Sequence, residues 1–129
     1  MAYLLDADWA IQALAGKTLA VNTLTELAPD GIAMSWITVG EIYEGAFGFP
    51  DPQPYLATFR AFIQPLPKLD LDDLTMERFA AIRSDLRRRG QLIPDFDLLI
   101  AATALRHDLT LLTYNLRHFS RIPNLKLHK

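Results

Sequence analysis

The 129 residues are half hydrophobic and 22% charged, as in an ordinary globular protein, and this length predicts a single domain over residues 1–129. The absence of cysteine excludes disulfides, thiolate metal sites and a cysteine nucleophile, and the absence of a long apolar run or signal peptide predicts a cytoplasmic protein without membrane spans. The net charge of −2 divides into −7 for residues 1–86 and +5 for residues 87–129. This uneven distribution either reflects solvated helix faces or sets an acidic site beside a basic surface suited to an anionic polymer.

Short strands and helices alternate along the first half of the chain. Turn signals at Gly16, at Pro29-Asp30-Gly31 and in the proline-rich stretch 48–54 separate the apolar segments. Between them we predict a strand at 3–5, helices at 8–15 and 18–28, a strand at 32–37, and helices at 39–47 and 55–63.

The second half continues the alternation. A short extended piece, LPKLDL, precedes a long helix that Asp72 or Asp73 can cap and that reaches Arg89, with Gly90 at the stop. A helix that is apolar on nearly every side then starts at Asp95 and is predicted to be central. A strand at 109–113, a turn or short helix at 115–119 and a last edge strand at 125–127 follow. Strands that alternate with helices predict an α/β fold with a mainly parallel sheet of four to five short strands.

The notable acidic residues fall next to the ends of predicted strands. Asp6 ends the first strand, Glu41 lies in the first turn after the strand at 32–37, and Asn115 follows the strand at 109–113. In an open parallel sheet the carboxyl ends of the strands form the ligand crevice. The central helix could direct Asp95 and Asp97 into that crevice, so residues distant in sequence would become neighbours.

Each of these residues also has a purely structural interpretation. Asp8 is favoured as the cap or first-turn acid of its helix, and Asp95, after a proline, could cap the central helix. Asp97 and Glu41 are harder to explain in this way, because both stand among apolar residues where an uncompensated carboxylate is costly. Glu44, one turn on from Glu41, either supports the site from behind that residue or is only solvated, and the solvated interpretation is favoured.

Acidic side chains that converge repel one another unless a cation holds them. Oxygen ligands without cysteine match a hard ion, Mg²⁺ or, as a substitute, Mn²⁺. The histidines do not form a zinc signature, and His107 and His118 are expected at the surface or at helix ends. No glycine-rich phosphate loop and no nucleophile-elbow motif occurs.

Four segments together resemble the PIN domain, specifically the VapC-type toxins of bacterial toxin–antitoxin pairs. They are YLLDADWAI, SWITVGEIYEGA, IPDFDLLIAATAL and LTLLTYNLRHFSRIPNLKL, and the likeness covers essentially the whole chain. The resemblance implies a three-layer α/β/α fold and a Mg²⁺-dependent endoribonuclease. The family's chemistry implies that water, activated by the ion, attacks an RNA phosphodiester and leaves a 5′-phosphate and a 3′-hydroxyl.

The resemblance also implies roles for individual residues. Asp6, Glu41 and Asp97 correspond to the metal-binding acids, and Asn115 to a further acidic or amide position that could orient the water or the phosphate. Thr113 precedes it as the family's threonine does. Two positions depart from the family pattern. Asp8 stands where the family often has asparagine. Asn115 is neutral, so Asp95 becomes a candidate for the fourth carboxylate, and the number of bound metal ions stays open.

Basic residues that follow Asn115 are candidates for substrate binding. Arg117 and Arg121, with His118 between them, are predicted to contact RNA phosphates, which supplies affinity without sequence choice. The arginines at 87–89 could do the same, or could interact with the carboxyl end of their own helix.

The family resemblance further implies a homodimer and a small antitoxin. The antitoxin's C-terminal segment would lie in an apolar groove near aromatic residues such as Phe47 and Phe49 and send a basic side chain toward the acids. Transfer RNA is one candidate substrate. Two alternatives stay open: an inactive PIN-like binding module, and a phosphatase of the DxD type, which the Asp6-Ala7-Asp8 sequence resembles. The match to the phosphatase is poor, because Ala10 stands where that class has threonine or valine, and the only lysines after Lys68 are the terminal Lys126 and Lys129.

Overall fold

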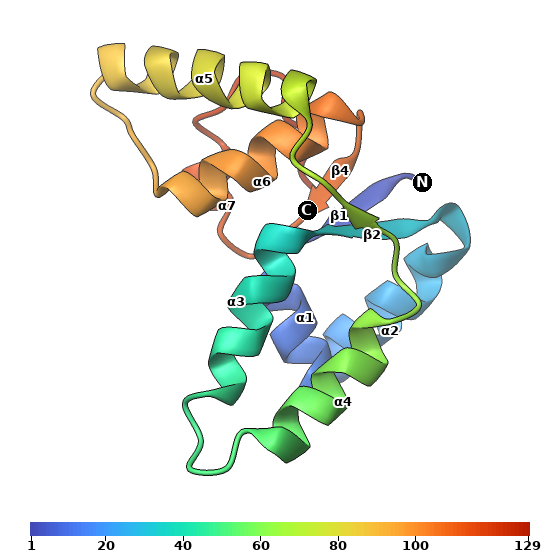
Figure 1. The fold of residues 1–129 in the computed structure, drawn as a ribbon. Helices are drawn as coiled ribbons and strands as arrows, with labels where there is room; N and C mark the ends of the chain where they lie inside the picture. The colour runs from blue at the N-terminus through green and yellow to red at the C-terminus, as the bar shows by residue number, and fades with distance from the viewer.

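Four short parallel strands form the centre of the computed structural model, which describes all residues from 1 to 129 (Figure 1). Their order across the sheet is β3-β2-β1-β4, and their bounds are β1 (Tyr3–Leu5), β2 (Ile32–Ser35), β3 (Lys68–Leu69) and β4 (Thr110–Leu112). Tyr3 of β1 lies opposite Ile32 on one side and Thr110 on the other. The parallel sheet expected from the sequence is therefore confirmed, and all four carboxyl ends meet at one edge.

Helices cover both faces of this sheet. Figure 1 shows α5 (Asp73–Arg88) and α6 (Asp95–Arg106) on one side, and α1 (Ala7–Leu14), α2 (Thr18–Leu27) and α4 (Gln53–Ile63) on the other. The remaining helical elements are a 3₁₀ turn, η1 (Ala28–Asp30), α3 (Trp36–Ala46) and the short α7 (Leu116–Phe119). None of the helices combines the length and the apolar character needed to cross a membrane.

Alternation along the strands divides the core into two parts. Leu4 of β1 joins the apolar cluster beneath α5, α6 and α7, whereas its neighbour Leu5 joins the cluster beneath α1 to α4. Leu111 and Leu112 of β4 are divided in the same way. All four side chains are almost fully buried, and each contributes about 1.5–3 kcal/mol of transfer free energy. The result is the three-layer α/β/α arrangement that the family resemblance implied.

The boundary between β2 and α3 differs from the prediction. The strand ends at Ser35 rather than at residue 37, and the helix begins at Trp36 rather than at residue 39. Ser35 is the N-cap of α3, because its Oγ accepts a hydrogen bond from the backbone N–H of Ile37 at 3.1 Å. Trp36 and Ile37, which were predicted as strand, thus lie in the first turn of a capped helix.

Two other predicted boundaries were also wrong. Helix α4 begins at Gln53, two residues early, because Pro54 in its first turn needs no hydrogen-bonding partner for a backbone N–H. The edge strand predicted at 125–127 is reduced to a single bridge between Leu111 and Leu127. Asn124, with φ of 68°, turns the chain immediately before this bridge.

Candidate metal-dependent nuclease site

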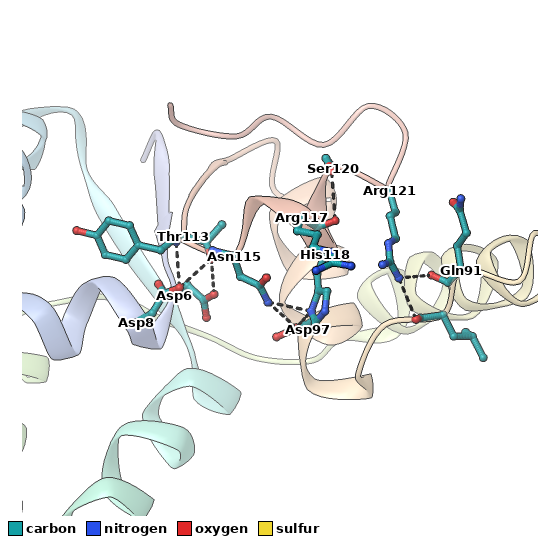
Figure 2. A network of polar contacts seen from close by, with 12 residues as sticks. Asp6, Asp8, Gln91, Asp97, Thr113, Asn115, Arg117, His118, Ser120 and Arg121 are labelled. Carbon is teal, nitrogen blue, oxygen red and sulfur yellow. Dashed lines mark hydrogen bonds and ion pairs between the residues drawn. The ribbon is translucent and has the colours of Figure 1, made fainter.

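Asp6 lies where β1 passes into α1, and both of its carboxylate oxygens are held. Its Oδ1 accepts a hydrogen bond from the N–H of Ala7 at 2.8 Å, which makes Asp6 the N-cap of α1. Its Oδ2 accepts from the hydroxyl of Thr113 at 2.8 Å (Figure 2). The adjacent pairing of β1 with β4 brings these two residues together across 107 positions of sequence. Asp6 is 6% exposed, so its charge is largely shielded from water.

Asp8 joins the same cluster from the first turn of α1. Its Oδ2 accepts hydrogen bonds from the N–H of Tyr114 at 2.9 Å and from the Thr113 hydroxyl at 3.3 Å. The structural interpretation favoured from the sequence is correct for the first turn, but the cap itself is Asp6. Asp8 therefore acts structurally and also adds negative charge beside Asp6.

Asp97 lies in the first turn of α6 and faces the loop after β4. Its Oδ2 is 3.1 Å from Nδ1 of His118 and 3.4 Å from Nδ2 of Asn115, and the latter two nitrogens are 2.9 Å apart (Figure 2). His118 lies at a helix end, as expected, in the last turn of α7, and its side chain is partly buried. It contacts the Asp97 carboxylate directly and restricts its orientation.

Glu41 completes the group of predicted acids from the second turn of α3. One carboxylate oxygen, Oε1, is buried and has no hydrogen-bonding partner. A buried carboxylate oxygen without a donor costs free energy, because it has lost water without compensation. Nothing else in the chain compensates this atom.

The acids influence one another electrostatically. Burial, and then the charge of Asp8, raises the pKa of Asp6 to about 6, although hydrogen bonds from Thr113 and Ala7 oppose the shift. Burial, and then the charges of Asp6 and Asp97, raises the pKa of Glu41 to about 7. The pKa of Asp8 is also raised, mainly by burial. No lysine or arginine neutralises these carboxylates, so their charges are mutually unfavourable at neutral pH.

Two further predicted residues are engaged elsewhere. Asp95 does not cap α6, which has no side-chain cap, and instead pairs with Nε of Arg83 at 3.0 Å. The Arg121 guanidinium donates to the backbone carbonyls of Gln91 and Leu92 at 3.3 Å each, and Figure 2 shows it directed toward that loop rather than toward the acids. Their assignments as a metal ligand and a substrate-binding residue stay predictions.

Arg117 differs from Arg121. Its side chain is exposed and forms no ion pair within the chain, while its backbone carbonyl accepts a hydrogen bond from Ser120. It is thus free to meet an anionic ligand beside Asn115.

Comparison with known proteins identifies the family. A family model described as the PIN domain matches residues 3–125. The chain belongs to the PIN-domain family. This PIN domain is 31% identical to "Ribonuclease VapC2" of Haemophilus influenzae over 96% of its own length and 94% of the relative. It is 30% identical to "tRNA(fMet)-specific endonuclease VapC" of Salmonella typhimurium, over 97% and 95% of the two chains.

Solved structures of similar sequence share the fold. A chain in the structure of VapBC2 from Rickettsia felis, bound to a DNA fragment from the promoter, superposes with a TM-score of 0.92 at 29% identity, over 99% of this PIN domain and 98% of that chain. A chain of DNA-bound VapBC from Salmonella typhimurium superposes with a TM-score of 0.91 at 30% identity, over 99% and 97%. The resemblance to VapC-type ribonucleases seen in the sequence is confirmed.

Nucleases of the PIN family depend on divalent cations, and the acids here fit such an ion. The donors of the proposed ligands Asp6, Glu41 and Asp97 are carboxylate oxygens, which suits a hard cation, and the unpartnered Oε1 of Glu41 is an atom that a cation would satisfy. A cation would also offset the burial and the mutual repulsion that raise the pKa of Asp6 and Glu41. As the side chains lie, no group of three or more acidic or histidine residues is close enough to hold an ion between them.

Sequence reasoning missed two members of the site. His118 lies three residues after Asn115, a spacing that places both on one face of a helical turn, and this spacing was the available signal. Tyr114 donates to Asp8 only through its backbone N–H, so the type of residue at this position gives no indication of the contact.

Proposed function

We propose that this PIN domain is a Mg²⁺-dependent endoribonuclease, the toxin of a toxin–antitoxin pair, which hydrolyses RNA phosphodiesters. The observation that carries the proposal is the buried, unpartnered oxygen of Glu41 in a cluster of carboxylates with raised pKa values. The names of the relatives, which include a ribonuclease and a tRNA(fMet)-specific endonuclease, support RNA as the substrate, with transfer RNA as a candidate.

In this proposal Asp6, Glu41 and Asp97 hold the cation. When bound, the ion lowers the pKa of water and offsets charge on the phosphodiester. Thr113 keeps the Asp6 carboxylate in place through its hydroxyl, and His118 and the Asn115 amide restrict the Asp97 carboxylate.

Two side chains beside the acids would handle the substrate. The Asn115 amide contacts Asp97 and His118 through Nδ2, so its Oδ1 is the atom left to accept a hydrogen bond from the attacking water. The free guanidinium of Arg117 would bind a neighbouring phosphate, which gives affinity without sequence choice.

The direct test is cleavage of total cellular RNA by the purified, antitoxin-free protein in Mg²⁺ and in EDTA, beside Asp97→Asn. Discrete Mg²⁺-dependent products that the variant does not make would support the proposal, and their ends would identify the target. No cleavage by the folded protein in Mg²⁺ would contradict it and favour an inactive binding module.

The proposal includes a cognate antitoxin and a homodimer. The matching structures are of VapBC bound to DNA, which supports a protein partner for this chain as well. Apolar surface is available between α3 and α4, where Phe47 is 65% exposed and Phe49, 43% exposed, stacks on Tyr55 with ring centroids 3.7 Å apart. Phe47→Ser is expected to weaken a co-purified partner, and unchanged stability of the complex would argue against this surface.

A further inference from the structure

A cavity of about 370 Å³ opens beside the acids, between α3 and the start of α6. We call it the Gly40 cavity, and it is lined by Trp36, Ile37, Gly40, Glu41, Glu44 and Phe96. Its volume is at the lower end of the range for small-ligand sites, about 300–1,000 Å³. Because Glu41 lines the cavity and also belongs to the acid cluster, a group bound here would be adjacent to a phosphate at the acids.

Two exposed aromatic rings line the cavity without an aromatic partner. Trp36 is 53% exposed and Phe96 is 56% exposed. The other strongly exposed rings near the site are covered on one face, as Tyr114 is by Trp9 at a centroid distance of 4.8 Å. Free aromatic faces are the platforms on which proteins stack unpaired nucleobases.

The third observation is a glycine that the chain's own packing does not require. Gly40 lies in the interior of α3, where glycine is a poorer helix former than alanine. A Cβ at this position would meet no atom within 4 Å, so no neighbour excludes a side chain. Trp36, Gly40 and Glu44 follow one another at intervals of four and share one face of the helix. The glycine therefore leaves a flat floor between the ring of Trp36 and the carboxylate of Glu44.

Glu44 supplies the polar group of the cavity. It is exposed, and its carboxylate has no hydrogen-bonding partner in the chain. A carboxylate only accepts hydrogen bonds, so it repels a phosphate and attracts a base edge that carries N–H groups. Guanine presents two such groups side by side, at N1 and N2, whereas the other common bases present donors singly or at one nitrogen.

We infer that the Gly40 cavity binds an unpaired nucleobase of the RNA, with guanine preferred, next to the phosphate that is cleaved. The base would lie on Gly40, stack against Trp36 and Phe96, and donate its Watson–Crick edge to Glu44. This inference rests on the proposed ribonuclease function and narrows its substrate class to single strands and loops, since a paired base cannot enter.

Two glycines of the same helix give a matched kinetic test. Gly45 also lies in α3 and also has open space where a Cβ would be, but it does not line the cavity. Gly40→Ala and Gly45→Ala should both fold at least as stably as the wild type. We expect Gly40→Ala to raise the KM for a short guanine-containing single-stranded RNA about tenfold, and Gly45→Ala to leave it within twofold. Equal KM values for the wild type and both variants would overturn the inference.

Tryptophan fluorescence tests binding without cleavage. The chain has two tryptophans, of which Trp9 is buried and Trp36 is exposed. In Ca²⁺ in place of Mg²⁺, a short unpaired RNA with guanine should quench Trp36, and the same RNA with uracil should bind several-fold more weakly. Glu44→Gln should remove that difference. No quenching, or equal binding of both RNAs, would overturn the base assignment.

Other occupants of this face give distinct results. Trp36→Ala should weaken RNA binding about tenfold without changing the oligomeric state in gel filtration. Dissociation of a dimer, or loss of a co-purified partner, with RNA binding unchanged would assign the face to a protein contact and overturn the inference. If the wild type cleaves no RNA at all, the proposed function fails. If it cleaves while Gly40→Ala and Trp36→Ala match it, only the inference fails.

Discussion

Acidic residues in two regions of the molecule have opposite electrostatic environments. Around α5 and α6, each of three aspartates has an arginine partner: Asp72 with Arg106, Asp85 with Arg89, and Asp95 with Arg83. At the carboxyl edge of the sheet, Asp6, Asp8 and Glu41 are near enough for their charges to raise pKa values within the group, and none of them pairs with an arginine or lysine.

The pKa values follow this division. Hydrogen bonds from Thr75, and then Arg106, lower the pKa of Asp72 to about 2, whereas burial and neighbouring charge raise the pKa of Glu41 to about 7. A carboxylate with a lowered pKa stabilises the fold through its charge. One with a raised pKa costs stability unless a cation arrives, and strongly raised values concentrate at functional sites. The number of acidic residues in a region therefore does not show whether they have a structural or a functional role. Their partners distinguish the two roles.

The largest expected effect separates Asp97 from Asp95, two positions away. Asp97→Asn is expected to lower Mg²⁺-dependent RNA cleavage by more than about 100-fold, because residues that only support a metal ligand already contribute 10–100-fold. Asp95→Asn removes only the pair with Arg83 and should leave cleavage within threefold. Rates under single-turnover conditions measure both. Equal losses in the two variants would remove the distinction between the two regions.

The next effect concerns the histidine that contacts Asp97. His118→Ala should weaken divalent-cation binding about 10–100-fold, since the Asp97 carboxylate loses the contact at 3.1 Å that restricts it. His118→Asn, whose amide can occupy the position of Nδ1, should recover most of that affinity. Titration calorimetry with Mn²⁺ measures both, and His107→Ala is the matched control. Full affinity in His118→Ala would exclude a supporting role.

The metal-free protein should become less stable as pH rises. In the unfolded chain these carboxyl groups titrate near pH 4, whereas the pKa of Asp6 is about 6 and that of Glu41 about 7 in the folded chain. Between those values the folded state binds more protons, so the free energy of unfolding falls as pH rises from about 4 to about 7.

We expect a loss of the order of 1–3 kcal/mol over that interval, mostly from Asp6, because the half-exposed Glu41 is screened by water. Urea unfolding in EDTA at several pH values measures it, and Asp6→Asn should flatten the curve. If the free energy of unfolding of the wild type instead rises over this pH interval, and by more than that of Asp6→Asn, the electrostatic account is contradicted.

The smallest effect belongs to Asp72 and has the opposite sign. Its lowered pKa means that the charged form stabilises the fold, and this contribution is lost as pH falls from about 4 to about 2. Asp72→Asn keeps a capping side chain for α5, so it should be slightly less stable than the wild type at pH 7 and equal to it near pH 2. A difference that does not depend on pH would show that the charge of Asp72 contributes nothing.

Periodicity and strand ends were sufficient to predict most of the fold and the positions of the acids. Asp6, Glu41, Asp97 and Asn115 were each located from their place after a strand or at the start of an apolar helix. The capping of α3 by Ser35 could not be separated from a longer strand, because Ile37 and Val39 suit either state. The sequence also could not show which side chains pair across space. The pairing of Arg83 with Asp95, and of Asp97 with His118, depends on how α5, α6 and α7 pack.

Direct titration of a divalent cation tests the central claim, that the acids at the carboxyl edge form a cation site. Calorimetry with Mn²⁺ would compare the wild type with Glu41→Gln, which alters the unpartnered buried oxygen, and with Asp95→Asn, which alters an acid of the other region. The account predicts binding to the wild type and to Asp95→Asn, and loss of binding in Glu41→Gln. Binding that is equal in all three proteins, or no binding to the folded wild type, would contradict it.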